Sequence, residues 1–275
     1  AKLHRTQFDA DGNILEVQIA KSLNHPNVVK YHDNGEVVLD GRKFAYIVFD
    51  YISGETVSQY VAREGYLSVY DAKTIVIGIL NGVKFLHALQ EPVIHNELTI
   101  QNVMLDMSKG TNVPRIIDFG YARYLSQGSS AFNKKGLNPF YSAPEVLNGV
   151  FSVKSDIFSV GAILYNLIFG IPPYFVDLSE CKDDLTAQRV KIEAQQELPL
   201  HIPDENKFEL DEQVTNIMRK ALATDIAERF ESADEFIRAL NGEIKVVRID
   251  NQKKIKSGES STKKVPHSVP KGKGF

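Results

Sequence analysis

Two short apolar segments near the middle of the chain constrain the fold more than any other feature. Residues 103–105 form the first segment and follow directly on Asn102, and residues 116–117 form the second and lead into Asp118. A polar gap that contains a glycine separates the two segments, which is typical of a β-hairpin. Such a hairpin delivers Asn102 and Asp118 to the same place.

The polar residues beside these segments form a set of oxygen donors. Asn102 supplies an amide oxygen, Asp118 supplies a carboxylate, and Glu97 supplies a second carboxylate shortly before the first segment. Oxygen donors of this kind suit Mg²⁺, which proteins bind through a few side chains together with substrate phosphates. The pattern therefore favours phosphoryl-transfer chemistry.

The spacing of these residues resembles that of the protein-kinase family. Residues 95–102, His-Asn-Glu-Leu-Thr-Ile-Gln-Asn, are similar to the catalytic loop H-R-D-L-x-x-x-N, and residues 118–120 are similar to D-F-G. The resemblance covers roughly residues 1–240. Three further segments follow in the family's order: Ala143-Pro144-Glu145 resembles A-P-E, residues 155–161 resemble S-D-x-W-S-x-G, and residues 169–174 resemble G-x-P-P-F.

This resemblance implies an α+β, bilobal protein-kinase-like fold. We expect residues 1–50 to form a partial small lobe, a β lobe with one helix that is incomplete at its N-terminus because no glycine-rich loop precedes Lys2. Residues 51–242 would form a mainly α-helical large lobe. Residues 243–275 would form a basic linker or disordered tail.

The resemblance also implies ATP as a cofactor. Lys2 corresponds to the lysine that contacts the α- and β-phosphates, and Glu16 corresponds to the helix glutamate that orients this lysine. Backbone groups near Asp50 and Ile52, in the expected hinge between the lobes, would bind the adenine. Together with Asn102 and Asp118, these four residues make up the expected nucleotide site.

Mg²⁺ and the reacting groups are assigned in the same way. Asp118 would hold the Mg²⁺ ion that bridges the phosphates, and Asn102 would hold a second ion. Glu97 stands where the family has the aspartate that accepts the substrate proton. Its side chain is longer by one methylene, and a misplacement of about 1 Å can cost on the order of 100-fold in rate. We therefore expect weakened catalysis.

Three other positions depart from the family pattern. Asn96 replaces the arginine of the catalytic loop, Thr99 replaces its lysine, and Asn138 replaces the threonine that contacts this lysine. The arginine is the group through which phosphate on the activation segment usually orders that segment, so this form of regulation is not expected.

Two functions are therefore open: a serine/threonine protein kinase of reduced activity, and a pseudokinase that acts as an ATP-binding or partner-binding regulatory module. A small-molecule kinase of the aminoglycoside-phosphotransferase type would share the catalytic loop. That class usually lacks the A-P-E and G-x-P-P-F segments found here.

Apolar periodicity and turn residues predict the remaining elements. Arg229 matches the large-lobe arginine that pairs with the glutamate of A-P-E, so we expect a buried ion pair between Arg229 and Glu145. The predicted strands cover residues 28–31 and 44–49, with turns at 33–35 and 40–41, and the predicted helices lie within 14–23, 57–64, 68–87, 177–200, 211–223 and 232–240.

The composition is that of a globular protein, because 43% of the residues are hydrophobic. The sequence holds one cysteine, Cys181, and begins with no recognisable signal sequence, so we expect a reducing, cytoplasmic location. Residues 157–175 are apolar enough to be considered as a membrane span. Asn166 and the adjacent Pro172 and Pro173 favour a buried central helix instead.

Charge is distributed unevenly along the chain. Residues 244–275 carry nine Lys or Arg and two Asp or Glu, a balance of +7, so the net charge of −3 leaves −10 for residues 1–243. We expect a protein substrate or a regulatory partner, and further domains joined through the basic tail. Neither a nucleic-acid partner nor a membrane is expected.

Overall fold

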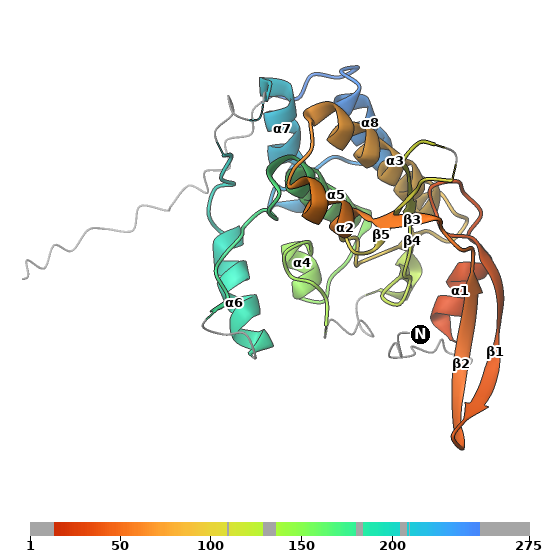
Figure 1. The fold of residues 1–275 in the computed structure, drawn as a ribbon. Helices are drawn as coiled ribbons and strands as arrows, with labels where there is room; N and C mark the ends of the chain where they lie inside the picture. The colour runs from red at the N-terminus through yellow and green to blue at the C-terminus, as the bar shows by residue number, and fades with distance from the viewer. Residues whose placement is uncertain are drawn as a thin grey trace, which may run out of the picture.

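The computed structural model describes residues 14–108, 110–128, 136–179, 184–203, 208 and 210–247. In Figure 1, helix α1 and the long hairpin of β1 and β2 lie on one side, and the other helices form the larger body. The expected α+β, bilobal fold is confirmed. The elements are α1 (Leu15–Lys21), β1 (Tyr31–Leu39), β2 (Arg42–Phe49), β3 (Gly54–Thr56), α2 (Val57–Glu64), α3 (Val69–His87), β4 (Val93–Ile94), β5 (Val103–Asp106), β6 (Val113–Ile116), β7 (Arg123–Tyr124), η1 (Leu125–Gln127), α4 (Pro144–Leu147), α5 (Val153–Phe169), α6 (Leu185–Gln196), α7 (Glu212–Ala221), η3 (Ile226–Glu228) and α8 (Ala233–Leu240).

The small lobe is built on an antiparallel pair of strands. β1 and β2 pair from Tyr31 opposite Phe49 to Leu39 opposite Arg42. The turn between them is the predicted one at residues 40–41, where both φ angles are positive, 49° and 72°. Two-residue hairpin turns need this conformation, and Asp-Gly adopts it readily.

The predicted turn at residues 33–35 is wrong, because this segment lies inside β1. The pairing register shifts between Tyr31 and Asp33, and Gly35 lies opposite Tyr46. A Cβ atom on Gly35 would lie 2.6 Å from the hydroxyl oxygen of Tyr46. The glycine therefore makes room for the tyrosine side chain, and the polar residues here accompany a strand irregularity instead of a turn.

The predicted strand at residues 28–31 is also wrong except for Tyr31, which begins β1. Val28 forms a single parallel bridge with Ile116, and the Val29 N–H group donates to the Ile116 carbonyl oxygen at 2.9 Å. The segment after α1 is therefore attached to β6 before the chain enters the small-lobe hairpin.

A three-stranded sheet with the order β3-β5-β6 lies where the chain passes into the large lobe. The hairpin predicted from the two apolar segments is β5 with β6, with Val103 opposite Ile116. β3 pairs with the other edge of β5, and a Cβ atom on Gly54 would lie 1.8 Å from the carbonyl oxygen of Leu105. Only glycine permits this approach of the two strands.

The predicted helices of the large lobe are present. α2 covers residues 57–64 as predicted, and α3 begins directly after Ser68, whose side chain caps the helix. The helix predicted within residues 177–200 is α6, which is limited to Leu185–Gln196.

α5 is the buried centre of the large lobe. Every side chain from residue 155 to residue 169 is buried. A Cβ atom on Gly161 would lie 2.7 Å from that of Ala221, so α5 and α7 pack closely at this glycine. Residues 157–169 of the apolar segment thus belong to a buried central helix, as predicted, and Gly170, with a φ of 76°, caps the end of α5. Across the described ranges, no helix combines the length and apolar character needed to span a membrane.

The chain stays packed beyond α8, where the basic linker was expected to begin at residue 243. Val246 is buried, and its N–H group donates to the side chain of Gln213 on α7 at 3.1 Å. The Gln213 amide donates in turn to the Ile244 carbonyl oxygen at 2.8 Å. The first residues of the expected linker therefore belong to the folded body, and the rest of it, beyond residue 247, lies outside the described residues.

Candidate active site

The β5–β6 hairpin places Asn102 and Asp118 at one end of the sheet. Asn102 precedes β5, Asp118 follows β6, and the Ile117 N–H group donates to the Asn102 carbonyl oxygen at 3.0 Å. Asp118 has a φ of 64°, a left-handed conformation that few residues other than glycine adopt. Its carboxylate accepts a hydrogen bond from the Gly120 N–H group at 3.3 Å. The turn after β6 is thus tightly specified.

Asn102 is held by the catalytic loop that precedes it. Its amide nitrogen Nδ2 donates to the carbonyl oxygen of Glu97 at 2.9 Å and to the Glu97 carboxylate oxygen Oε2 at 3.3 Å. The buried hydroxyl of Thr99 accepts hydrogen bonds from the N–H groups of Gln101 and Asn102, at 3.2 and 3.3 Å. Thr99 therefore shapes the loop turn, and the structure brings Glu97 and Asn102 together.

The catalytic loop is anchored by Asp156 on α5, a residue to which the sequence analysis gave no role. Asp156 is fully buried, and its carboxylate accepts hydrogen bonds from the N–H groups of His95 and Asn96 at 2.9 and 3.0 Å. His87 at the end of α3 contacts the same carboxylate through Nε2 at 2.9 Å. A carboxylate that is buried in an apolar helix needs such partners. The sequence signal for this role is therefore the single acidic residue in the otherwise apolar segment of α5.

The ring of His95 fixes the middle of the site. Nδ1 accepts a hydrogen bond from the Glu97 N–H group at 3.3 Å, so Nε2 carries the proton and donates to the Ile117 carbonyl oxygen at 3.2 Å. Complete burial lowers the pKa of His95, although the charge of Asp156 opposes this shift. His95 is therefore neutral, and it packs against Phe119 with ring centres 5.0 Å apart.

Asn96 links the catalytic loop to the start of the activation segment. It is buried with a φ of 65°, and its amide nitrogen donates to the carbonyl oxygens of Tyr121 at 3.3 Å and Ile94 at 3.4 Å. Pairing of β4 with β7 reinforces this attachment. In the described part of the chain, Asn96 holds the segment through an uncharged contact at the position where the family carries arginine.

Glu16 lies in the first turn of α1, the helix of the small lobe. Burial, and to a lesser extent the negative charge of Asp118, raise the pKa of the Glu16 carboxyl to about 7. α1 therefore brings Glu16 close to Asp118. A cation between these two carboxylates, such as the expected lysine, would lower this pKa, but Lys2 lies outside the described residues.

Asp50 and Ile52 lie in the connection between β2 and β3. The Asp50 N–H group donates to the Lys30 carbonyl oxygen at 2.8 Å, and its carboxylate contacts Nε2 of His32 and lies 3.9 Å from Nη1 of Arg115. Ile52 is buried in the core. The structure fixes both residues at the junction of the lobes, and their contact with adenine stays a prediction.

Asn27 is a second residue that the sequence analysis did not single out. Its side chain donates to the Pro114 carbonyl oxygen at 2.9 Å, and its own carbonyl oxygen accepts from the Ile116 N–H group at 2.9 Å. It therefore ties the loop after α1, and with it Glu16, to β6, which leads into Asp118. An asparagine in a His-Pro-Asn turn carries no distinctive signal, since such residues are common in turns.

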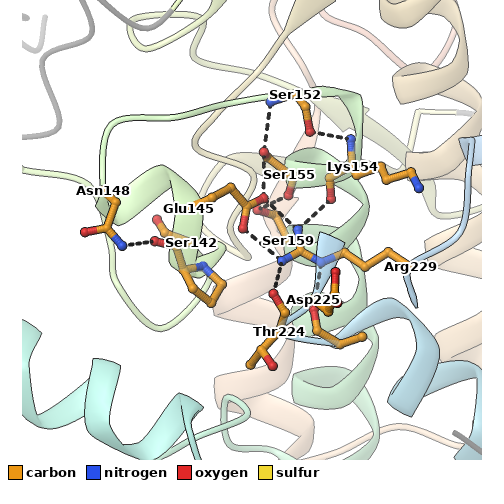
Figure 2. A network of polar contacts seen from close by, with 12 residues as sticks. Ser142, Glu145, Asn148, Ser152, Lys154, Ser155, Ser159, Thr224, Asp225 and Arg229 are labelled. Carbon is orange, nitrogen blue, oxygen red and sulfur yellow. Dashed lines mark hydrogen bonds and ion pairs between the residues drawn. The ribbon is translucent and has the colours of Figure 1, made fainter. Parts of the chain in front are cut away.

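The predicted ion pair between Glu145 and Arg229 is confirmed. Arg229 is 1% exposed, and its Nη1 and Nη2 atoms lie 2.6 and 2.8 Å from Oε1 and Oε2 of Glu145. Figure 2 shows the guanidinium also facing the backbone of Lys154 and Thr224, to whose carbonyl oxygens it donates at 3.1 and 3.4 Å. This paired geometry holds the end of the activation segment on the large lobe.

Asn102 and Asp118 have the donor atoms that Mg²⁺ prefers. No cluster of three or more His, Cys, Asp or Glu residues suited to a metal ion occurs among the described residues. Since the Asn102 nitrogen donates to Glu97, its oxygen is the atom available to a metal.

The bilobal fold, the catalytic-loop hairpin and the Glu145–Arg229 pair together define the fold of the protein-kinase class. The family model described as "Protein kinase domain" matches residues 2–239. Because the match covers most of the sequence, the chain belongs to the protein kinase domain family.

Curated relatives agree with this assignment. The chain is 32% identical over 172 residues to "Calcium-dependent protein kinase 4" of Plasmodium falciparum, covering 62% of the chain and 31% of the relative. It is 25% identical over 268 residues to "Probable serine/threonine-protein kinase PknB" of Bifidobacterium longum, covering 93% and 37%. It is 28% identical over 224 residues to "Serine/threonine-protein kinase PknB" of Mycobacterium leprae, covering 80% and 34%. The chain thus spans about a third of the length of these relatives.

Proposed function

We propose that this kinase domain binds ATP with Mg²⁺ and transfers the γ-phosphoryl group to a serine or threonine hydroxyl of a protein substrate. The observation that carries the proposal is the convergence of Glu97, Asn102 and Asp118 at the end of the β5–β6 hairpin. Relatives named as serine/threonine-protein kinases support the substrate class.

Each of the three residues has a role in this reaction. Asp118 and Asn102 would hold Mg²⁺, which when bound neutralises charge on the phosphates. Glu97 would accept the proton of the substrate hydroxyl as its oxygen attacks the γ-phosphorus and the bond to ADP breaks. Lys2, oriented by Glu16, would hold the α- and β-phosphates, and the backbone near Asp50 and Ile52 would hold the adenine.

The frame around these residues supports a rigid site. Asp118 and Asn96 both have left-handed backbone conformations, with φ values of 64° and 65°. Strained conformations of this kind persist only where the surrounding structure holds them, and they concentrate at functional sites. Here Asp156 accepts the N–H group of Asn96, and His95 contacts the carbonyl oxygen of Ile117, the residue before Asp118.

A pseudokinase is the second candidate function, and two substitutions favour it. Thr99 carries no charge and uses its hydroxyl inside the loop, so it does not replace the lysine that steadies the transferred phosphate. Glu97 is longer by one methylene than the aspartate that the family carries at this position, which displaces the proton-accepting carboxylate. In this alternative the domain binds nucleotide, or a partner, without transfer.

One experiment with two readouts separates these functions. Thermal unfolding of the full-length protein is followed with ATP, with and without Mg²⁺, and transfer of radiolabel from ATP to a generic protein substrate is measured in parallel. Asp118→Asn serves as the metal-site control. We expect Mg²⁺ to increase the stabilisation by ATP in wild type but not in Asp118→Asn, and we expect weak transfer in wild type alone.

Metal-dependent stabilisation without transfer would favour the pseudokinase. Stabilisation by ATP that Mg²⁺ leaves unchanged would contradict the metal site at Asn102 and Asp118.

A further inference from the structure

We infer that α7 and the end of α8 form a binding site for a short extended peptide, and that a strap, residues 244–246 of the chain itself, occupies this site in the structure. The ligand class is an extended segment with apolar side chains at alternate positions. The same segment supplied as a free peptide should enter the site when the strap is displaced. The inference goes beyond the proposed function, because it uses no residue of the candidate active site.

A tight turn after α8 directs the strap onto α7. Gly242 has a φ of 77°, and its N–H group donates to the Ala239 carbonyl oxygen at 3.1 Å. The next N–H group, that of Glu243, donates to the Arg238 carbonyl oxygen at 2.9 Å. These two bonds form a Schellman motif, which ends a helix and turns the chain away from its axis. Because α7 packs beside α8 (Figure 1), the chain meets α7 directly after this turn.

Two side-chain amides of α7 bind the strap through its backbone. Gln213 Nε2 donates to the Ile244 carbonyl oxygen at 2.8 Å, and Gln213 Oε1 accepts from the Val246 N–H group at 3.1 Å. About one helical turn further along α7, Asn216 Nδ2 donates to the Val246 carbonyl oxygen at 3.1 Å. Within the described ranges, the hydrogen bonds of the strap backbone all go to these two side chains. Contacts of this kind hold an extended peptide whatever its side chains are.

The amide of Gln213 is itself fixed in orientation. Its nitrogen also donates to the Ala239 carbonyl oxygen at the end of α8, at 3.2 Å. The amide therefore uses its donors on two carbonyl oxygens and its acceptor on one N–H group. Rotation by half a turn would set the oxygen against both carbonyl oxygens. The site thus presents one donor and one acceptor in a fixed order to the strap.

The side chains of the strap alternate between the protein and the solvent. Val246 is 5% exposed and belongs to the hydrophobic core, and Ile244 packs against that core. Lys245 is exposed between them, and Val247, which follows, is 76% exposed. This alternation is that of an extended strand. The site therefore selects apolar side chains at the first and third positions of a segment and leaves the second free.

A different account makes the strap a permanent part of the core. In that account its displacement unfolds α7 and α8 and leaves no site to be filled. α7 has a second support, however, because it packs closely on α5 where Gly161 faces Ala221. The two accounts therefore differ in whether the body stays folded, with an open site, once the strap has left.

The test displaces the strap in the full-length protein and supplies it again as a peptide. Val246→Asp places a charge in the apolar seat, which drives the strap out of the site. The probe is a synthetic peptide with the sequence of residues 242–248, Gly-Glu-Ile-Lys-Val-Val-Arg. The control probe is the same peptide carrying Val246→Asp. Binding is followed by NMR of the ¹⁵N-labelled protein, at the side-chain amide signals of Gln213 and Asn216.

We expect the peptide to bind Val246→Asp and to shift both amide signals. Its dissociation constant for wild type should be at least about tenfold higher, because the tethered strap competes at a high effective concentration. The control peptide, and the double variant Gln213→Met/Val246→Asp, should each bind about tenfold more weakly or less, because hydrogen bonds or apolar contacts are lost. Gln195→Met/Val246→Asp is the matched control, since Gln195 is a half-buried glutamine on α6, and it should bind the peptide as Val246→Asp does.

Hydrogen exchange of the wild-type protein is a second measurement, which decides if Val246→Asp does not fold. The Val246 N–H group should exchange through local opening of the strap, faster than the amides of α5. Gln213→Met should accelerate this exchange about tenfold and leave α5 unchanged, because it removes the acceptor of that N–H group.

The inference is overturned if folded Val246→Asp does not bind the peptide, or if Gln213→Met/Val246→Asp binds it equally well. Exchange of Val246 at the rate of the α5 amides, in wild type and in Gln213→Met alike, would also overturn it. The strap would then leave only when the whole domain unfolds.

Discussion

Asp156 shows how one buried charge can organise an active site that it does not enter. Its carboxylate is fully buried on α5 and receives the N–H groups of two consecutive loop residues, His95 and Asn96. Both donors lie at the start of the catalytic loop, where Asn96 has a left-handed backbone conformation with a φ of 65°. The position of Glu97, the next residue, therefore depends on a side chain from another element.

We predict that Asp156→Asn lowers the free energy of unfolding by about 3 kcal/mol. The substitution replaces one of the two buried carboxylate oxygens with an NH₂ group, which then faces N–H donors of the catalytic loop. The free energy of unfolding is measured by urea denaturation. Hydrogen exchange of the His95 and Asn96 amides should accelerate in the variant.

Asp234→Asn is the matched control, because that carboxylate is exposed on α8 and pairs with Lys84 at the surface. Its effect on the free energy of unfolding should be small, because exposed ion pairs contribute little to stability. Unchanged exchange at His95 and Asn96 in Asp156→Asn would show that Asp156 does not hold the loop.

At the scale of elements, the loop between α1 and β1 connects the two lobes. Asn27 in this loop bonds to Pro114 and Ile116 of β6, while His25 stacks on Phe85 of α3 with ring centres 5.1 Å apart. The Asn27 N–H group donates to Nδ1 of His25 at 3.1 Å. This bond requires an unprotonated Nδ1, so the loop is built around a neutral histidine.

The stability of the fold should therefore depend on the protonation of His25. Burial lowers the pKa of His25 below its ordinary value of 6.5. The unfolded chain then binds more protons than the folded chain between the two values, so stability is fully present above pH 6.5 and is lost as pH falls towards the folded pKa. Between about pH 7.5 and about pH 5.5, His25 should therefore lower the free energy of unfolding, whereas Glu16, whose pKa is raised to about 7, acts in the opposite direction.

His25→Asn provides the comparison. An asparagine can accept the same N–H group two residues ahead without titrating, so as the pH falls the variant should lose less stability than wild type. The pH dependence itself should not vanish, because the pKa of buried His95 is lowered in the same direction. An identical pH dependence in wild type and His25→Asn would exclude His25 as its source.

At the scale of the whole molecule, the elements that could be predicted from the sequence are those that depend on residue patterns within a short stretch of the chain. The β5–β6 hairpin, the start of α3 after Ser68 and the buried α5 all follow from periodicity and turn residues, which act within a few residues. The turn predicted at residues 33–35 was wrong because Gly35 lies inside a strand. This glycine makes room for the side chain of Tyr46 on the opposite strand and does not reverse the chain. A contact across the fold is harder to predict: the lone carboxylate of Asp156 in an apolar helix indicates that it has buried partners, but it does not indicate that they are in the catalytic loop.

The Glu145–Arg229 pair is the exception, since motif resemblance predicted a contact between residues 84 positions apart. It joins α4, at the end of the activation segment, to the chain between η3 and α8. Arg229 also donates to the Ala223 carbonyl oxygen at 2.7 Å and lies over the ring of Phe158 at 4.9 Å. One side chain thus connects three parts of the large lobe.

We predict that Arg229→Ala lowers the free energy of unfolding by about 3–5 kcal/mol, because it leaves the Glu145 carboxylate without its cation inside the protein. For a chain of this size the melting temperature should fall by roughly 10 °C. Arg238→Ala is the control, since its pair with Glu243 is half exposed and should contribute less than about 1 kcal/mol.

The double variant Glu145→Gln/Arg229→Ala should lose less free energy of unfolding than the sum of the losses in the two single variants. Each partner's buried charge is costly only when the other partner is removed. Equal melting temperatures for Arg229→Ala and Arg238→Ala would mean that the buried pair does not hold the activation segment to the large lobe.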